Sequence, residues 1–301
     1  MAPAAHAESA HPRHWAAGAL LVNAFVWGLS WWPFRQLAQL GLHPLCTTAL
    51  VYAFAVLVVL AFRPQAWRGL LAHPWVWLLA LSSGLTNVGF NWAVTVGDVV
   101  RVVLLFYLMP AWAVLLAWPL LGEKPTPPAL LRLTLALAGV LLVLKRPDTA
   151  WSIPQSLADY LALMGGLCFA LTNIMLRRLR FAPESTRMMG MFAGGSLLAG
   201  AMALWGGHNG TVPSLPIAQM PWLLLLGLAV AFLISNLALQ YGASRLRSGT
   251  TSLVMLSEII FASVSSMVLG AAQVDARTLA GGGLILLAAL WAAWADGTAS
   301  H

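Results

Sequence analysis

Charged side chains are scarce in this sequence. They make up 8% of the 301 residues, whereas soluble globular domains carry about 25%. Hydrophobic residues account for 60% of the chain, which is more than a soluble protein can bury. The composition therefore excludes an ordinary soluble domain and predicts an integral membrane protein.

Groups that serve metal and cofactor chemistry are also missing. The two cysteines, Cys46 and Cys168, lie in apolar segments, which favours packed thiols over a disulfide framework or a zinc site. The seven histidines fall outside the apolar segments or at their margins, without metal-ligand spacing, and no glycine-rich phosphate loop is present. We expect no cofactor, no bound metal and no hydrolysis of nucleotides by this chain.

The net charge of +7 does not indicate a nucleic-acid partner. The basic residues stand singly between apolar segments, as signals of membrane orientation do. A cytoplasmic N-terminus places most of the 16 Lys and Arg residues on the inner side. This pattern predicts a multi-pass protein of the bacterial inner membrane with both termini in the cytoplasm. Residues 1–14 are interpreted as a short tail, followed by a first span that is retained and is not a signal peptide. The basic residues expected on the outer side are Arg35, Arg101, Lys145, Arg146 and Arg277.

Apolar segments long enough to cross a bilayer follow one another along the whole chain. A helix needs about 20 apolar residues to span the hydrocarbon core. The linkers hold almost all charges and most prolines, and they are too short to fold by themselves. We therefore predict an all-α fold of ten transmembrane helices. The expected spans are residues 16–34, 44–62, 75–96, 102–121, 129–144, 158–176, 188–205, 221–241, 249–269 and 278–294.

The second half of the chain repeats the first. Residues 77–97 align with residues 222–242, and Pro110 falls at the position of Glu258. Each half holds five spans, and an odd number inverts the second copy relative to the first. Inverted repeats recur in secondary transporters, where the substrate site lies near the membrane midplane between the halves. The expected boundaries are 1–14 for the tail, 15–147 for the first repeat, 148–157 for a linker, 158–296 for the second repeat and 297–301 for a C-terminal tail.

The run LMPAWAVLLAWPLLGEKPT, with ALAGVLLV after it, resembles the signature of the EamA family in the drug/metabolite transporter superfamily. A looser match in the second half extends the likeness over all ten spans. The resemblance implies two inverted halves, cytoplasmic termini and the movement of metabolites, often outward, with exporters of amino acids and of cationic drugs among similar proteins. The second copy departs from the pattern, with Glu258 in place of Pro and Gly270-Ala271 in place of Gly-Glu. This departure suggests that Glu123 in the first copy is structural.

Glu258 is the sharpest candidate for a functional residue. It lies about ten residues from either end of the ninth span, where a charge costs a few kcal/mol unless it faces a cavity. Helical spacing places it on one face with Thr251 and Ser265. It is interpreted as a proton-coupling carboxyl or as a countercharge for an ammonium group. The alternative is a protonated carboxyl that bonds a neighbouring helix.

Pro110 is a candidate helix break and gate. It has no amide hydrogen, so the carbonyl of Phe106 is expected to be free and the helix kinked. Kinked or discontinuous helices at matching positions of two repeats point to a substrate site. The alternative is a kink that only improves packing.

Other polar and aromatic residues deep in the spans complete the candidate site. Amide side chains in the membrane tie helices together as often as they contact ligands, and each deep tryptophan can be plain packing or the wall of a cavity that holds a cation. The candidates are Asn87, Asn91, Asn173, Asn236, Gln240, Trp27, Trp92, Tyr107 and Trp112.

Together these features predict a secondary transporter that exports small metabolites by alternating access. Amino acids are the expected substrates, with a preference for aromatic or large apolar ones, and cationic drugs are the alternative. A membrane-embedded enzyme is the alternative of another class. The expected partners are the small-molecule substrate and the lipid bilayer, without nucleic acid, and the chain is expected to be a monomer or a weak homodimer.

Overall fold

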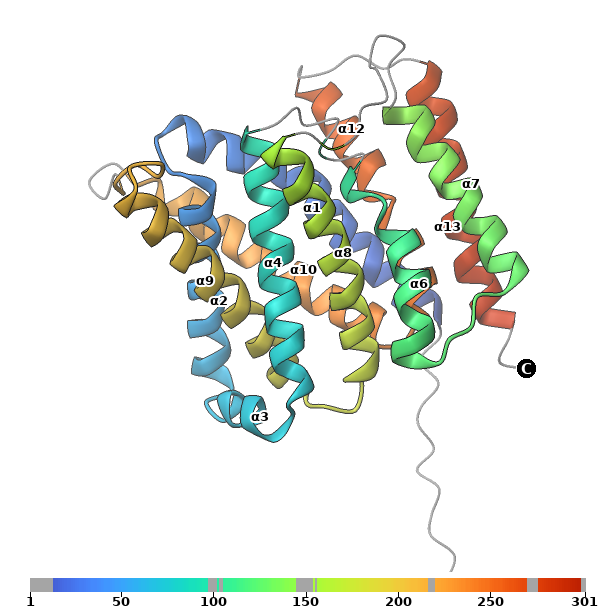
Figure 1. The fold of residues 1–301 in the computed structure, drawn as a ribbon, viewed down its shortest axis with the longest axis horizontal. Helices are drawn as coiled ribbons and strands as arrows, with labels where there is room; N and C mark the ends of the chain where they lie inside the picture. The colour runs from blue at the N-terminus through green and yellow to red at the C-terminus, as the bar shows by residue number, and fades with distance from the viewer. Residues whose placement is uncertain are drawn as a thin grey trace, which may run out of the picture.

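The structure is a computed structural model, and it describes residues 13–96, 102, 105–144, 154, 156–215, 220–269 and 276–298. Within these residues the secondary structure is helical throughout (Figure 1). Residues 1–12, Arg101, most of the 148–157 linker and Gly270-Ala271 lie outside the described part. The helices are α1 (Arg13–Gln39), α2 (Pro44–Phe62), α3 (Ala66–Ala72), α4 (Trp75–Val96), α6 (Met109–Leu121), α7 (Pro127–Leu144), α8 (Leu157–Arg178), α9 (Glu184–His208), α10 (Trp222–Ala243), α11 (Ser248–Met255), α12 (Glu258–Val268) and α13 (Ala276–Thr298).

Every predicted span contains helix in the structure. The second and third spans match α2 and α4 residue for residue. Two features were not predicted: the short helix α3 follows the second span, and the ninth span is divided into α11 and α12. Both depend on backbone hydrogen bonds at helix ends, which apolar periodicity does not report.

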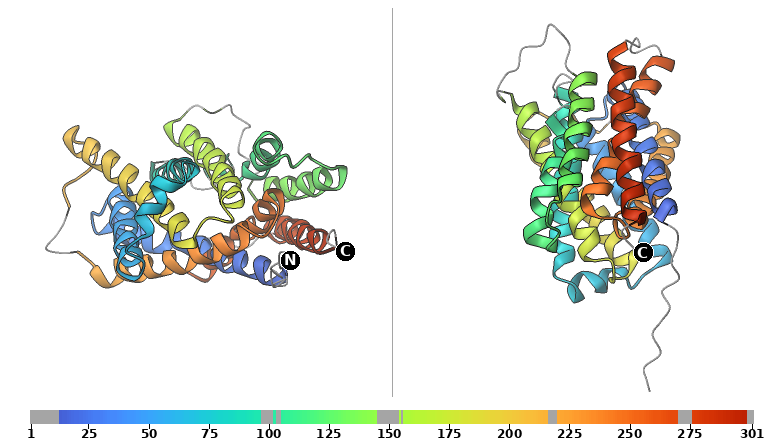
Figure 2. Two further views of the ribbon diagram at one scale, coloured as in Figure 1. Left: turned by 90° about the horizontal axis from the view of Figure 1, so that it is seen from below. Right: turned by 90° about the vertical axis from the view of Figure 1, so that its right-hand side faces the viewer.

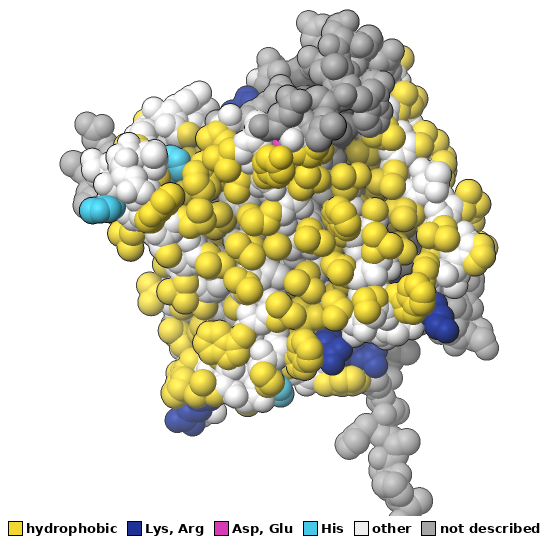
Figure 3. All heavy atoms as spheres, in the orientation of Figure 1, with side chains coloured by type: hydrophobic (Ala, Val, Ile, Leu, Met, Phe, Trp, Pro, Cys, Tyr) yellow, Lys and Arg dark blue, Asp and Glu magenta, His cyan; other side chains and the backbone are white. Residues whose placement is uncertain are grey.

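The surface is apolar and the interior holds the amides, as expected for a protein surrounded by lipid. Leu223 is 89% exposed, whereas Asn23 and Gln240 are fully buried. Hydrophobic side chains cover most of the face in Figure 3, and Lys and Arg side chains gather mainly at its lower edge. By length and composition alone, four helices of the described residues could cross a membrane: α2, α8, α9 and α10.

The two halves pack around each other with matching helix pairs. The first helix of each half contacts the third helix of the other, so that α1 lies on α10 and α8 lies on α4. The second helices pair as α2 with α9, and the fifth helices pair as α7 with α13 (Figures 1 and 2). This pairing is that of two copies related by a pseudo-two-fold axis, in keeping with an inverted repeat.

Both described ends of the chain lie on the same side of the molecule. Helix α1 begins and α13 ends at the bottom of Figure 1. The α6–α7 turn and the connection between α8 and α9 lie at this end as well. We call it the termini face.

His43 caps the first turn of α2 at the end opposite the termini face. Its Nδ1 accepts the backbone N–H of Leu45 at 3.2 Å. Burial lowers the pKa of the His43 imidazole from 6.5. The folded state therefore binds fewer protons than the unfolded state, so this contribution to stability is complete above pH 6.5 and declines as the pH falls below it.

Replacing His43 by asparagine should make stability less dependent on pH. Asparagine is a good N-cap that does not titrate. In detergent, the wild-type Tm is expected to fall modestly between pH 7 and pH 5, and the Tm of His43→Asn should fall less. Equal slopes for the two proteins would contradict this role of His43.

Candidate functional site

The fourth span is broken just before Pro110. The chain leaves the helix at Tyr107 and Leu108, and α6 then begins with Pro110 in its first turn. The N–H of Leu108 bonds the carbonyl of Leu105 at 3.3 Å, and the N–H of Ala111 bonds that of Leu108 at 3.0 Å. Proline is tolerated in a first turn because its missing N–H has no partner there in any case. The break thus lies on the N-terminal side of the proline.

The ninth span is broken at the corresponding place without a proline. Leu256 and Ser257 separate α11 from α12, and α12 begins with Glu258. The Ser257 hydroxyl donates to the carbonyl of Val254 at 2.7 Å. A serine that bonds its own backbone competes with the helical ladder. This serine is the sequence signal that could have pointed to the break.

The two breaks meet at the Tyr107–Glu258 pair. The Tyr107 hydroxyl donates a side-chain hydrogen bond to the Glu258 carboxyl. Tyr107 is 1% exposed and Glu258 is 6% exposed. The structure therefore brings together two candidates that lie 151 positions apart in the sequence, one from each half.

The first helix of each half presses a glycine against the broken helix of the other half. A Cβ atom at Gly166 in α8 would overlap the carbonyl oxygen of Phe106, the acceptor that Pro110 leaves without its helical donor. A Cβ atom at Gly28 in α1 would lie 2.9 Å from the carbonyl oxygen of Glu258. Only glycine permits such close approach, so both breaks are held by backbone packing.

A small cavity lies between the two halves, among α1, α2, α4, α8, α9 and α10. Its volume is about 30 Å³, which is room for a water molecule. Trp27 stacks on Phe232 at its wall, with ring centroids 4.6 Å apart. Three of the predicted residues line it, namely Trp27, Asn87 and Asn236. The lining residues are Asn23, Trp27, Tyr52, Ser83, Thr86, Asn87, Phe169, Thr172, Met191, Phe232, Ser235, Asn236 and Leu239.

The amides of α4 tie this helix to α2. The Tyr52 hydroxyl donates to Asn87 Oδ1 at 2.7 Å, and Asn91 Nδ2 donates to Thr48 Oγ1 at 2.7 Å. In the other half, Gln240 Nε2 donates to Asn236 Oδ1 at 2.6 Å. Asn91 thus has a partner on α2, as the packing interpretation expects, whereas Asn87 and Asn236 combine hydrogen bonds with a place in the cavity wall.

Several buried polar atoms have no hydrogen-bond partner within the described part of the chain. They include both amide atoms of Asn173, Oε1 of Gln240, and the hydroxyls of Thr251 and Ser252. These residues lie on α8, α10 and α11, which contact one another. Buried polar groups are normally satisfied, so these atoms are available to water or to a substrate. Ser252 was not among the predicted candidates.

The two remaining tryptophans differ in their surroundings. Trp92 packs against two of the apolar core clusters and fits the packing interpretation. Trp112 lies one turn after the break in the fourth span, and its Nε1 is buried without a partner among the described residues. An indole N–H in this state is a possible donor to a ligand.

The Gly-Glu turn after α6 ties the two halves together at the termini face. Gly122 ends α6 in the left-handed conformation, with φ 72°. Glu123 Oε1 lies 3.5 Å from Arg177 Nε of α8, and Arg178 Nη1 donates to the carbonyl of Leu120 at 2.7 Å. This arrangement supports the structural interpretation of Glu123.

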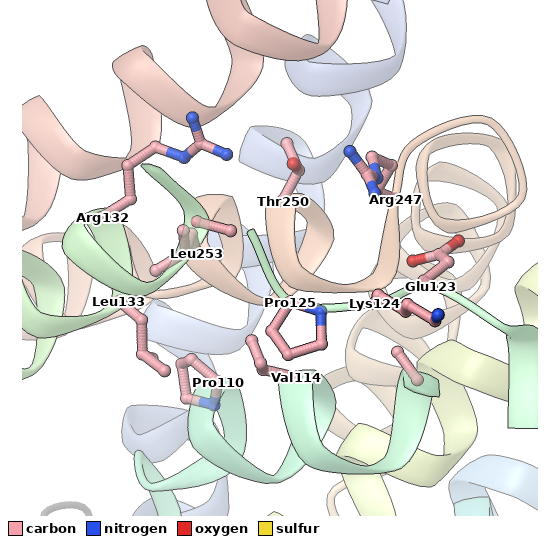
Figure 4. A pocket seen from close by; sticks show the side chains of 12 residues that line it. Pro110, Val114, Glu123, Lys124, Pro125, Arg132, Leu133, Arg247, Thr250 and Leu253 are labelled. Carbon is pink, nitrogen blue, oxygen red and sulfur yellow. The ribbon is translucent and has the colours of Figure 1, made fainter. Parts of the chain in front are cut away.

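A second pocket opens beside this turn (Figure 4). It has a volume of about 50 Å³ and lies among α6, the α6–α7 turn, α7 and α11. Pro110 and Thr250 form part of its wall. The pocket therefore reaches from the termini face toward the break in the fourth span.

Comparisons with known proteins agree with this architecture. The model of the EamA-like transporter family matches the chain twice, over residues 14–145 and 156–294. A solved structure described only as "Crystal structure of protein" has a TM-score of 0.72 and 19% identity, and the alignment covers 95% of this chain and 99% of the other. This likeness shows the fold alone. No curated protein sequence matches the chain.

The family match spans nearly the whole sequence in two copies, which confirms the predicted family and the two-repeat helical membrane fold. The chain therefore belongs to the EamA-like transporter family, and it is a multi-pass membrane transporter.

Proposed function

We propose that this protein exports amino acids, preferably aromatic or large apolar ones, across the bacterial inner membrane by alternating access without ATP. The termini face is then cytoplasmic, as the Lys and Arg side chains at its edge favour. The observation that carries the proposal is the meeting of two broken helices, one from each half, at the Tyr107–Glu258 pair.

Broken helices at matching positions supply the chemistry that a polar substrate needs inside a membrane. They expose backbone groups and helix ends where continuous helices would offer only side chains. Glu258 adds a carboxyl that can hold the ammonium group of an amino acid or exchange a proton during transport. Trp27 and Phe232 add apolar aromatic surface nearby.

The size of the cavity between the halves supports alternating access. Small-molecule sites occupy about 300–1,000 Å³, whereas this cavity has a volume of about 30 Å³. The halves must therefore move apart to admit a substrate. The first helix of each half rests on the broken helix of the other, so such a movement changes the surroundings of both breaks.

Counterflow tests carrier function directly. Vesicles with the purified protein, preloaded with unlabelled phenylalanine, should accumulate labelled phenylalanine several-fold faster than unloaded vesicles, without ATP. Protein-free vesicles are the control. Equal uptake with and without preloading would exclude a carrier for this substrate.

Resistance of a bacterial strain that overproduces the protein separates the two substrate classes. Resistance to toxic aromatic amino-acid analogues supports the proposal. Resistance to lipophilic cations alone would replace it with the efflux of cationic drugs, which a buried carboxyl beside aromatic rings could also serve.

A further inference from the structure

The pocket at the termini face is rich in positive charge. Among the described residues, its wall carries the cations Lys124, Arg132 and Arg247 and one carboxyl, Glu123. Glu123 also faces Arg177 of α8, at 3.5 Å between Nε and Oε1. Cations therefore outnumber the carboxyl in and around this pocket, and its field attracts anions.

Arg132 is the most deeply buried of these cations. It is 8% exposed, and its guanidinium lies 5.7 Å from the ring centre of Trp291. Its Nε is buried without a hydrogen-bond partner among the described residues. A guanidinium presents five donors in a fixed plane, and leaving one of them buried and unsatisfied costs free energy. An anionic oxygen from a ligand would satisfy it.

Further donors lie next to Arg132. Arg132 and Arg247 stand on opposite sides of Thr250 in Figure 4. Thr250 belongs to the first turn of α11, whose N-cap Arg247 gives no side-chain capping bond. The first backbone N–H groups of a helix and its positive dipole end favour anions. The helix dipole and the two guanidinium groups therefore both attract anions.

The shape of the pocket limits what it can hold. A volume of about 50 Å³ is less than twice the ~30 Å³ that one water molecule occupies in the liquid. Such a space takes the end group of a small molecule. The pocket also reaches Pro110, three residues after Tyr107, so it leads toward the pair that contains Glu258.

We propose that this pocket binds the carboxylate of the transported amino acid through Arg132, Arg247 and Thr250. The inference rests on the proposed function and adds a second station to it, which the substrate occupies in turn with Glu258, the group proposed to receive the ammonium. Cations without a carboxylate meet mainly like charge at this entrance, because Lys124, Arg132 and Arg247 outnumber Glu123. The pocket therefore selects amino acids against cationic drugs.

Three probes separate the two ends of the substrate: phenylalanine, phenylpropionate without the ammonium group, and phenethylamine without the carboxylate. Their binding to purified protein in phosphatidylcholine nanodiscs would be measured by competition with labelled phenylalanine. Arg132→Gln is expected to lower the affinity for phenylalanine relative to phenethylamine at least about tenfold, as for loss of a charge-assisted hydrogen bond. Glu258→Gln should instead weaken the binding of phenethylamine more than the binding of phenylpropionate.

Controls separate charge from folding. Arg132→Lys should retain part of the preference for phenylalanine over phenethylamine. Arg68→Gln removes a cation of α3 outside the pocket and should leave this preference unchanged. Melting curves of each variant report folding. An unchanged ratio of phenylalanine to phenethylamine in folded Arg132→Gln would overturn the inference while leaving the proposed function intact.

Two other results would also overturn it. Stabilisation of the wild type, but not of Arg132→Gln, by phosphatidylglycerol in the nanodiscs, with an unchanged probe ratio, would assign the pocket to a lipid headgroup. Failure of the wild type both to bind phenylalanine and to show counterflow would instead refute the proposed function on which the inference rests.

Discussion

Replacing Glu258 by glutamine is expected to reduce phenylalanine counterflow at least about tenfold. Glutamine keeps the size of the side chain but removes both the negative charge and the exchangeable proton. Loss of one charged partner in a buried pair costs a few kcal/mol, and each 1.4 kcal/mol corresponds to a factor of ten. Proteoliposomes assayed between pH 5.5 and pH 8 measure both the rate and its dependence on pH.

Tyr107→Phe is the matched variant for this experiment. It removes the hydroxyl that donates to Glu258 but leaves the carboxyl in place, so we expect a smaller loss of transport and a retained dependence on pH. A Glu258→Gln protein with unchanged pH dependence and unchanged affinity for amine-bearing substrates would reduce Glu258 to a helix-packing residue. The carrier mechanism proposed for this protein would then lose its coupling group.

Gly28→Ala is expected to destabilise the protein and slow transport. The new methyl group would lie 2.6 Å from Cβ of Phe261 and 2.9 Å from the backbone nitrogen of Ala262 and the carbonyl oxygen of Glu258. Backbone atoms cannot move aside cheaply, and overpacking of this kind costs about 1–3 kcal/mol. Relief of the clash would push α12, which carries Glu258, away from α1.

The same substitution at Gly18 provides a control in the same helix. No heavy atom lies within 4 Å of a Cβ built there. Both variants gain the same helix propensity, up to about 1 kcal/mol from Gly to Ala, so their difference in unfolding free energy isolates the contact with α12. Equal melting temperatures for Gly18→Ala and Gly28→Ala would show that α1 and α12 are not closely packed at this point.

Much of the architecture was accessible from the chain alone. Continuous apolar runs predict membrane helices because the bilayer leaves no other partner for backbone groups, and the expected second and third spans coincide with α2 and α4. The alignment of Pro110 with Glu258 identified the two positions next to which the spans break, although only the kink at Pro110 was predicted. It did so because two copies of one sequence place corresponding residues at corresponding depths.

Partners of individual side chains could not be predicted. Asn91 bonds Thr48 of α2, while the amide of Asn173 has no partner among the described residues; nothing in the local sequence separates these two asparagines. In the sequence, Arg132 is no different from the other basic residues expected on the inner side, although the structure buries it over Trp291. Whether a polar side chain finds a hydrogen-bond partner depends on neighbours that are far away in the chain.

The sequence by itself determined that this chain is a helical membrane protein of two related halves, because composition and the length of the apolar segments decide whether a chain inserts into a bilayer as helices. Only the tertiary structure decided where the fourth and ninth spans break, that Tyr107 bonds Glu258, and which cations surround the pocket at the termini face. The physical reason is that hydrophobicity acts on each segment separately, whereas hydrogen bonds and close backbone contacts form between segments and depend on their relative position.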